Sequence, residues 1–201
     1  MSKQSSAFRL TIRALLTALI ILQTMVPMLG FIPLGPTSLT IIHITVIVAA
    51  IVLGPWDGAF VGLMWGLFTI VRALTAPSSP LDPIIFTNPI VAVVPRVLVG
   101  VVAGYTFNWT YKRLHLVGAS VVAAIFGTLT NTVLVVALMG LLYTGTLAQA
   151  YGVTSSGLLK VLMGIVAANG VPEVLGAAVL TPLITTALFS VSRLHLRQLP
   201  K

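Results

Sequence analysis

Long apolar runs, separated by short breaks rich in turn-forming residues, dominate the chain. A helix rises 1.5 Å per residue, so ~20 apolar residues cross the ~30 Å hydrocarbon core of a bilayer. Lipid offers the backbone no hydrogen-bond partners, so helices are expected. The pattern therefore predicts an all-α integral membrane protein, a six-transmembrane-helix bundle that forms a single domain over residues 1–201. The predicted spans are Phe8–Pro27, Ser38–Leu53, Gly58–Thr75, Pro89–Phe107, Leu116–Leu142 and Leu158–Phe189.

Two of these spans have unusual lengths. Ser38–Leu53 is short, so it is either steeply placed or shielded by its neighbours. Leu158–Phe189 is too long for one straight span. We expect kinks at Pro172 and Pro182, because proline removes a helical hydrogen bond and clashes with the preceding turn.

Three breaks lie on one side of the membrane in this topology. Residues 28–37 and 76–89 are dense in proline and glycine, and they are either shaped lids or ordinary turns between helices. Residues 143–157 form a third break, for which the pattern predicts no regular structure.

Charge is scarce and mostly basic, with 11 Lys and Arg against 3 Asp and Glu and a net charge of +8. Charged residues make up 7% of the chain, whereas a soluble domain uses about a quarter. The positive-inside rule places both termini in the cytoplasm. Cations that flank spans indicate anionic lipid headgroups, not nucleic acid, as their partners. The basic residues on the cytoplasmic side are then Lys3, Arg9, Arg13, Lys112, Arg113, Arg193, Arg197 and Lys201.

Several chemistries are disfavoured by what the sequence lacks. It has 0 cysteines, and its 3 histidines lie in different segments without metal-ligand spacing. It has no phosphate-binding loop of the ATPase type and no pairing of a nucleophile with a base. We therefore expect neither enzyme activity nor a cofactor or metal site.

Polar and aromatic residues inside the apolar runs are the first candidates for function. Trp65, Phe68 and Arg72 follow one another at i, i+3 and i+7 and so share one stripe of a helix. Either this stripe lines a pocket for an amphipathic anion, or the rings pack within the bundle while Arg72 reaches water.

Arg96 lies roughly 10 Å inside the outer end of the fourth predicted span. A guanidinium cannot be neutralised in a protein, so it must find a partner. Asp57 falls on the opposite side of the membrane. Arg96 therefore either pairs with Glu173 or Asp82 as structural glue or holds a ligand anion, and we favour the ligand.

Further polar residues in the fifth and sixth spans share helical faces. Thr128 and Asn131 are spaced i, i+3, and Asn169 and Glu173 are spaced i, i+4. Their alternative role is hydrogen bonding between helices. In this topology most of these groups reach the level of Arg96, which predicts a pocket for a small polar ligand. The predicted ligand-binding residues are Arg96, Asn131, Trp65, Arg72, Phe68, Asn88, Thr128, Asn169 and Glu173.

Short motifs also carry a resemblance to a known family. The first are Ala14-x-x-x-Ala18 and the run Leu53-Gly54-Pro55-Trp56-Asp57-Gly58-Ala59, followed by Gly62. With six spans in about 200 residues, they resemble the substrate-binding S components of energy-coupling factor (ECF) vitamin transporters over nearly the whole chain. Within that family the chain is similar to the pantothenate-specific members through residues 34–43 (LGPTSLTIIH), 127–132 (GTLTNT) and 169–173 (NGVPE).

The resemblance implies a bacterial cell-membrane complex in which this chain captures a vitamin from outside. A transmembrane coupling subunit and two ATPase subunits would supply the energy, with Ala14 and Ala18 docking on the coupling subunit and the outer loops acting as gates. Pantothenate has a carboxylate, an amide and two hydroxyls, which suits one arginine, several amide or hydroxyl groups and an aromatic wall. The alternatives are an S component for folate, a thiamine precursor or pyridoxine, a membrane enzyme, and a scaffold without transport function.

Overall fold

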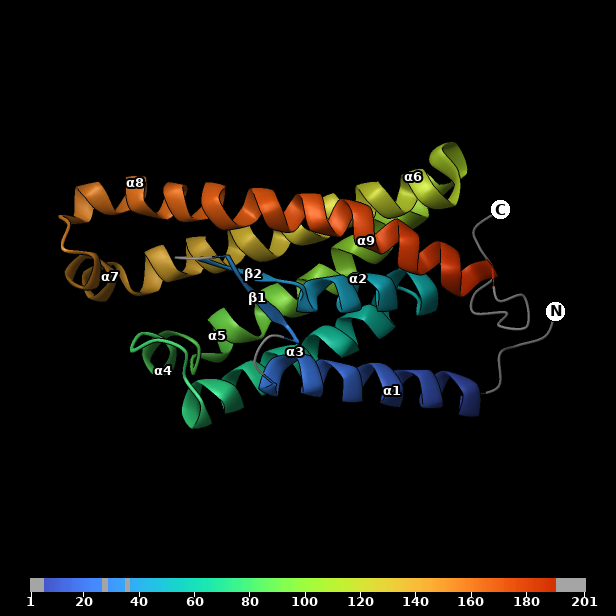
Figure 1. The fold of residues 1–201 in the computed structure, drawn as a ribbon, viewed down its shortest axis with the longest axis horizontal. Helices are drawn as coiled ribbons and strands as arrows, with labels where there is room; N and C mark the ends of the chain where they lie inside the picture. Colours follow the sequence, from blue (N-terminus) through green and yellow to red (C-terminus); the bar gives the residue numbers. More distant parts are fainter. Residues whose placement is uncertain (1–5, 27–28, 35–36, 191–201) are drawn as a thin grey trace.

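The computed structural model describes residues 6–26, 29–34 and 37–190 as a bundle of helices with two short strands (Figure 1). In chain order the elements are α1 (Ser6–Met25), β1 (Phe31–Leu34), β2 (Thr37–Thr40), α2 (Ile42–Leu53), α3 (Pro55–Thr75), α4 (Asp82–Ile85), α5 (Pro89–Ala92), α6 (Val94–Leu142), α7 (Thr144–Tyr151), α8 (Ser155–Ile165), the π-helical η1 (Val166–Gly170) and α9 (Val171–Ser190).

The described part of the chain contains 3 helical stretches that are long and apolar enough to cross a membrane. They are Pro55–Thr75, Pro89–Leu142 and Ser155–Ser190, and Leu10–Met25 and Ile42–Leu53 are shorter apolar helices. The prediction of a helical protein with segments long and apolar enough to span a membrane is confirmed.

α6 consists of two antiparallel arms. The chain reverses at His115, whose φ of 52° and ψ of −165° are not helical (Figure 1). The arms pack closely, because a Cβ atom added at Gly127 would lie 3.2 Å from the Cβ of Ala103. We predicted that the first arm ends at Phe107, but it continues to the reversal, since residues 108–114 contain neither glycine nor proline to end it.

α2 is the centre of the bundle. All of its residues are buried, and it contacts α1, α3, α6 and α9. A helix that is hydrophobic on all of its faces, as α2 is apart from His43 and Thr45, is stable only when other elements cover every face. Of the two explanations for the short second span, shielding by neighbours is therefore correct. The helix begins at Ile42, not at Ser38, because Thr37–Thr40 is a strand.

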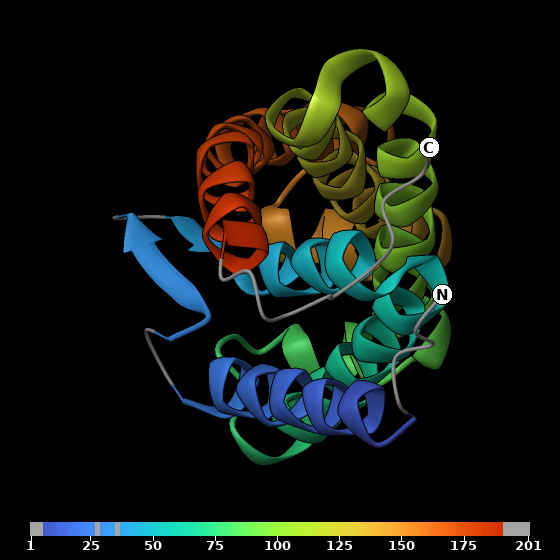
Figure 2. The same ribbon diagram turned by 90° about the vertical axis from the view of Figure 1, so that its right-hand side faces the viewer.

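β1 and β2 form an antiparallel pair in which Phe31 lies opposite Thr40 and Leu34 opposite Thr37. Figure 2 shows the pair on one flank of the bundle, between α1 and α9. Within the segment 28–37, which was predicted as a lid or a turn, the structure thus describes strand β1 and the first residue of β2.

The other two breaks also contain helices. Residues 76–89 hold α4, and the prediction of no regular structure in residues 143–157 is wrong, because α7 occupies Thr144–Tyr151. The sequence signal for α7 was Gly152, which ends the helix in the left-handed conformation at φ 65°.

α8, η1 and α9 follow one another as one long helical stretch, seen along the top of Figure 1. Pro172 has no N–H and clashes with the carbonyl four residues earlier, so the turn before it widens into the π-helical segment Val166–Gly170. The distortion predicted at Pro172 is thus the π-helical segment that ends two residues before the proline. At Pro182, where a second kink was predicted, α9 continues as one helix.

A stripe of glycines lets α3 and α6 approach each other. Gly58 and Gly62 are four residues apart on α3, and Gly100 faces them from α6. A Cβ added at Gly62 would lie 2.1 Å from the carbonyl oxygen of Arg96, and one added at Gly100 would lie 2.2 Å from the carbonyl carbon of Gly58. Small residues allow such close backbone packing in membrane bundles. This contact fixes the backbone of Arg96 against α3, one turn from Trp65.

We expect Gly62→Ala to destabilise the protein by ~1–3 kcal/mol, because the added methyl group meets backbone atoms that cannot move aside. Gly176→Ala is the matched control: nothing lies within 4 Å of its added Cβ, and alanine favours the helix. Thermal unfolding of both purified variants checks this. Equal stability of the two variants would contradict the close packing of α3 on α6.

Candidate functional site

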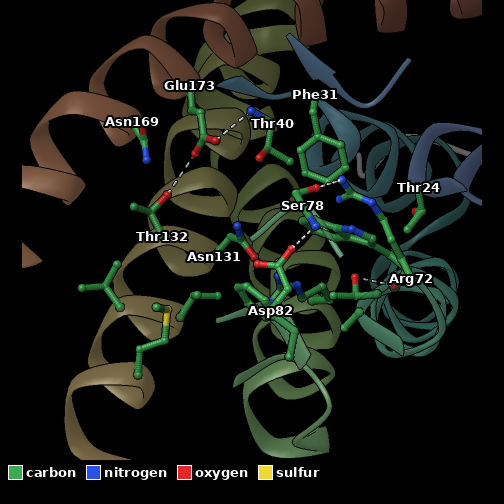
Figure 3. A pocket seen from close by; sticks show the side chains of 18 of the residues that line it. Thr24, Phe31, Thr40, Arg72, Ser78, Asp82, Asn131, Thr132, Asn169 and Glu173 are labelled. Carbon is green, nitrogen blue, oxygen red and sulfur yellow. Dashed lines mark hydrogen bonds between the residues drawn. The ribbon is translucent and has the colours of Figure 1, made fainter. Parts of the chain in front are cut away.

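A cavity of about 540 Å³ lies between the helices and the strand pair (Figure 3). Its size is typical of a small-molecule site. Its apolar wall is formed by Phe31, Trp65, Ala73, Phe86, Val135, Val136, Met139 and Ile165. Its polar lining comes from Thr24, Thr40, Thr69, Arg72, Ser78, Asp82, Arg96, Asn131, Thr132, Asn169 and Glu173.

Arg96 is buried in this cavity with only 6% of its surface exposed. One terminal nitrogen donates a 2.7 Å hydrogen bond to the carbonyl of Val91. The guanidinium carbon lies 5.0 Å from the ring centroid of Trp65 and 5.6 Å from that of Phe86. Aromatic faces attract a cation in this geometry. The glycine contact on α3 and these rings thus hold the charged group at the cavity wall.

Arg96 interacts electrostatically with the nearby carboxylate of Glu173 but makes no direct ion pair in the described part of the chain. Within the described ranges neither Glu173 nor Asp82 forms an ion pair with it, and its buried Nε has no hydrogen-bond partner. A guanidinium that is desolvated and not neutralised favours the binding of an anion at the same place.

Glu173 lies on α9 directly after the π-helical turn, with 6% exposure. Its Oε1 accepts a 2.9 Å hydrogen bond from the backbone N–H of Thr40, and its Oε2 accepts a 3.3 Å bond from the hydroxyl of Thr132 (Figure 3). The carboxylate therefore joins three elements around the cavity: α9, β2 and the second arm of α6.

Arg72 occupies the opposite side of the cavity and is half-buried. Its guanidinium carbon lies 4.2 Å from the ring centroid of Phe31 on β1, and its Nη2 donates to the hydroxyl of Ser78. Asp82 accepts a 2.7 Å hydrogen bond from the N–H of Ser78 (Figure 3). It also accepts a 2.8 Å bond from the hydroxyl of Ser79. This network ties the segment before α4 to α3 and β1.

Two amide side chains present unused acceptors. The Oδ1 atoms of Asn131 and Asn169 are buried and have no hydrogen-bond partner in the described structure. Asn169 belongs to the π-helical segment η1, a type of distortion that is frequent at functional sites. Buried acceptors without a donor are rare because they are costly. A ligand with hydroxyl or amide donors would satisfy them.

Three predicted site residues do not line the cavity. Phe68 is half-buried on α3, and Thr128 is fully buried with its hydroxyl unpartnered among the described residues. Asn88 caps α5 by accepting a 2.9 Å bond from the N–H of Ile90 and donates a 3.1 Å bond to the hydroxyl of Tyr143. The predicted residues that the structure does bring together at the cavity are Trp65, Arg72, Arg96, Asn131, Asn169 and Glu173.

Sequence reasoning missed several lining residues. Phe31 and Thr40 come from the strand pair, Ser78 and Phe86 from the segment around α4, and Thr132 follows directly after Asn131. Thr132 could have been predicted, because it belongs to the same short polar run as Asn131. Nothing in the sequence showed that the strand pair turns two of its residues toward this cavity.

The predicted docking residues Ala14 and Ala18 are exposed on α1. Large apolar side chains on the same helix are exposed too, including Leu15 at 64%. The guanidinium of Arg13 pairs with Asp57, which is only 1% exposed at the beginning of α3. This ion pair fastens α1 to α3.

A bundle of long apolar helices with a cavity lined by buried charged and polar side chains is typical of membrane proteins that bind a small polar ligand. A family model described as "ECF transporter, substrate-specific component" matches residues 8–185. The chain belongs to this family of substrate-specific components of ECF transporters.

Two curated relatives are similar to the chain over most of its length. The "Pantothenate transporter PanT" of Leuconostoc mesenteroides subsp. mesenteroides is 36% identical over 191 residues, which cover 91% of this chain and 93% of the relative. The "Pantothenic acid transporter PanT" of Lactococcus lactis subsp. cremoris is 38% identical over 166 residues, which cover 76% of this chain and 79% of the relative.

We expect Arg96→Met to leave the ligand-free protein at least as stable as the wild type. A buried charge without an ion pair costs desolvation energy, and an apolar side chain of similar length is often neutral or stabilising there. Arg13→Met is the matched control: it removes a direct ion pair of buried Asp57 and should lower stability. Thermal unfolding without ligand checks both. A large loss of stability in Arg96→Met would show that Arg96 is structural glue.

Proposed function

We propose that this protein is the pantothenate-binding S component of an ECF transporter. It captures the vitamin from outside the cell, and partner subunits hydrolyse ATP to deliver it to the cytoplasm. The observation that carries the proposal is the buried guanidinium of Arg96, whose Nε has no hydrogen-bond partner among the described residues, in a cavity that also holds the unpartnered amide oxygens of Asn131 and Asn169. The family membership and the names of the two relatives support it.

The chemistry of pantothenate matches the groups in the cavity. Its carboxylate pairs with Arg96, with Arg72 as a second cation nearby. Its hydroxyl and amide donors bond to Asn131, Asn169 and Glu173. Its dimethyl group packs on the face of Trp65. In this assignment Phe68, Asn88 and Thr128 lie behind the cavity wall and support it.

We also propose that the chain crosses the membrane six times as one domain over residues 1–201. The spans are α1, α2, α3, the two arms of α6, and the stretch from α8 to α9. Figure 1 shows the beginning of α1, the end of α9 and the reversal of α6 at the same end of the bundle. Lys112 and Arg113 are exposed near that reversal, so the positive-inside rule supports a cytoplasmic location for this end and both termini.

The exposed face of α1 is the proposed contact with the transmembrane coupling subunit, to which two ATPase subunits are attached. Ala14 and Ala18 leave room for a close helix–helix approach. The ion pair between Arg13 and Asp57 holds this face in a fixed position on α3. The remaining apolar surface contacts lipid.

Binding of labelled pantothenate to the purified protein tests the proposal. We expect Arg96→Ala to weaken binding by ~2–5 kcal/mol, because it removes one side of a buried charge pair. Arg113→Ala, which removes an exposed cation at the other end of the bundle, should bind as the wild type does. Undiminished binding by Arg96→Ala would reject the assignment. Stronger stabilisation of the wild type by folate, a thiamine precursor or pyridoxine would indicate another vitamin.

A second test separates binding from transport. We expect Ala14→Trp and Ala18→Trp to bind pantothenate normally but to abolish its uptake by cells that contain the complete transporter, because the indole blocks close approach of a partner helix. Ala187→Trp places the same bulk at an exposed alanine on α9 and should leave uptake intact. Normal uptake by the α1 variants would contradict the docking role, and loss of binding would indicate misfolding.

A further inference from the structure

Exposed aromatic side chains gather at one end of the bundle, on the face formed by α3 and the first arm of α6. Trp56 and Trp109 are 72% and 80% exposed, and Tyr105 is 52% exposed. Together with Phe60 they are four of the six aromatic side chains that are exposed among the described residues. The cavity lining includes none of these four. Lipid tails accept any apolar side chain, so this concentration of rings indicates a different surrounding at this end.

Close packing of α3 on α6 brings the rings to neighbouring positions. A Cβ atom added at Gly104 would lie 2.6 Å from the Cα of Pro55. Trp56 directly follows Pro55, and Tyr105 directly follows Gly104, so both lie at the same level of the bundle. Trp109 is four residues further along α6, about one turn, and therefore shares a face with Tyr105.

The exposed stripe of this arm changes from aromatic to cationic toward the reversal of α6. Tyr105, Trp109, Lys112 and Arg113 are all exposed and are spaced i, i+4, i+7 and i+8. The stripe therefore passes from rings to cations within ~12 Å. This order is typical of the level at which hydrocarbon meets headgroups, because an indole or a phenol has an apolar body and a polar tip. Figure 1 shows the reversal at the end of the bundle opposite α7.

No carboxylate accompanies the two cations on this exposed face. Asp57 is only 1% exposed, whereas Asp82 and Glu173 line the cavity. These are the 3 acidic residues of the chain. The stripe is therefore positively charged at its outermost end, which complements an anionic surface.

The neighbouring face of α1 differs in its chemistry. Between Leu10 and Met25 the helix contains no aromatic residue. Its exposed large side chains are aliphatic, namely Leu10, Leu15, Leu19 and Leu22. A partner helix approaches closely over small side chains such as those of α1, whereas projecting indoles hold it away. The aromatic face thus fits lipid headgroups better than it fits a partner helix.

We propose that Trp56, Tyr105, Trp109, Lys112 and Arg113 form a binding surface for anionic phospholipids of the inner leaflet, which anchors this end of the protein at the headgroups. The rings occupy the boundary between acyl chains and headgroups, and the two cations bind phosphate. This inference rests on the topology given with the proposed function, in which this end is cytoplasmic. It assigns a role to a surface that neither the ligand cavity nor the α1 contact uses.

Tryptophan fluorescence tests the depth of the anchor, because the chain has 3 tryptophans and Trp65 is only 2% exposed. The full-length protein is reconstituted into vesicles whose lipids carry bromine, which quenches nearby indoles, either near the headgroup or near the bilayer centre. Trp56→Phe and Trp109→Phe each retain one exposed tryptophan, and the double variant retains only Trp65. We expect shallow bromine to quench Trp56 and Trp109 about twofold more than deep bromine, with little quenching of Trp65 by either.

A second measurement tests the preference for anionic headgroups. The vesicles contain equal amounts of phosphatidylglycerol and phosphatidylcholine, and only one of the two lipids is brominated at a time. We expect phosphatidylglycerol to associate with the surroundings of Trp109 about fivefold more strongly, equivalent to ~1 kcal/mol. The double substitution Lys112→Gln and Arg113→Gln should abolish this preference. Lys160→Gln, which removes an exposed cation of α8, is the matched control and should retain it.

The opposite results overturn the anchor. Stronger quenching of Trp56 and Trp109 by deep bromine would place the rings among acyl chains, and quenching as weak as that of Trp65 would mean that protein covers them. Equal association of both headgroups, or a preference that survives the double substitution, rejects the binding of anionic lipid.

These measurements use no pantothenate, so their outcome is independent of the vitamin assignment. The proposed topology is tested separately. The chain has 0 cysteines, so His115→Cys introduces a unique thiol at the exposed reversal of α6. We expect a membrane-impermeant maleimide to label this thiol only after the cells are opened. Labelling of intact cells would place this end outside and reject the inner leaflet as the anchor's location.

Discussion

The site depends on a guanidinium that is held in an apolar bundle without a direct ion pair among the described residues. Arg96 is stabilised by neutral partners, a backbone carbonyl and two aromatic faces, that attract its charge but do not neutralise it. In a low-dielectric environment such a group interacts far more strongly with an anion than it would in water. The backbone of Arg96 is fixed because Gly62 lets α6 lie directly on α3. Close glycine packing and anion recognition are therefore parts of one arrangement.

Different elements contribute different kinds of polar group to the cavity lining. Basic groups come from α3 and the first arm of α6, whereas Glu173 comes from α9 and the free amide oxygens come from the second arm of α6 and η1. A ligand with an anion at one end and hydrogen-bond donors at the other has one favourable orientation in such a site. The exposed face of α1 lies outside the cavity, so the proposed ligand site and the proposed partner contact use separate surfaces.

Much of the fold was accessible from the sequence, because lipid leaves a buried backbone almost no choice but a helix. The positions of Arg96, Asn131 and Glu173 within apolar runs marked them for function, since polar groups at that depth are costly. The connections were less accessible. The helix that continues to His115 and the helix α7 lie in stretches whose polarity resembles that of loops.

By itself, the sequence determined that this is a helical membrane protein of the S-component family, and it singled out a few buried polar residues as the predicted ligand-binding groups. Only the tertiary structure decided that Phe31 meets Arg72, that Thr40 meets Glu173, and that Phe68 and Thr128 lie outside the cavity lining. The physical reason is that hydropathy is a property of each segment, whereas the rotation of a helix about its axis depends on contacts with distant segments. In this bundle, glycine contacts such as that of Gly62 with Arg96 set that rotation.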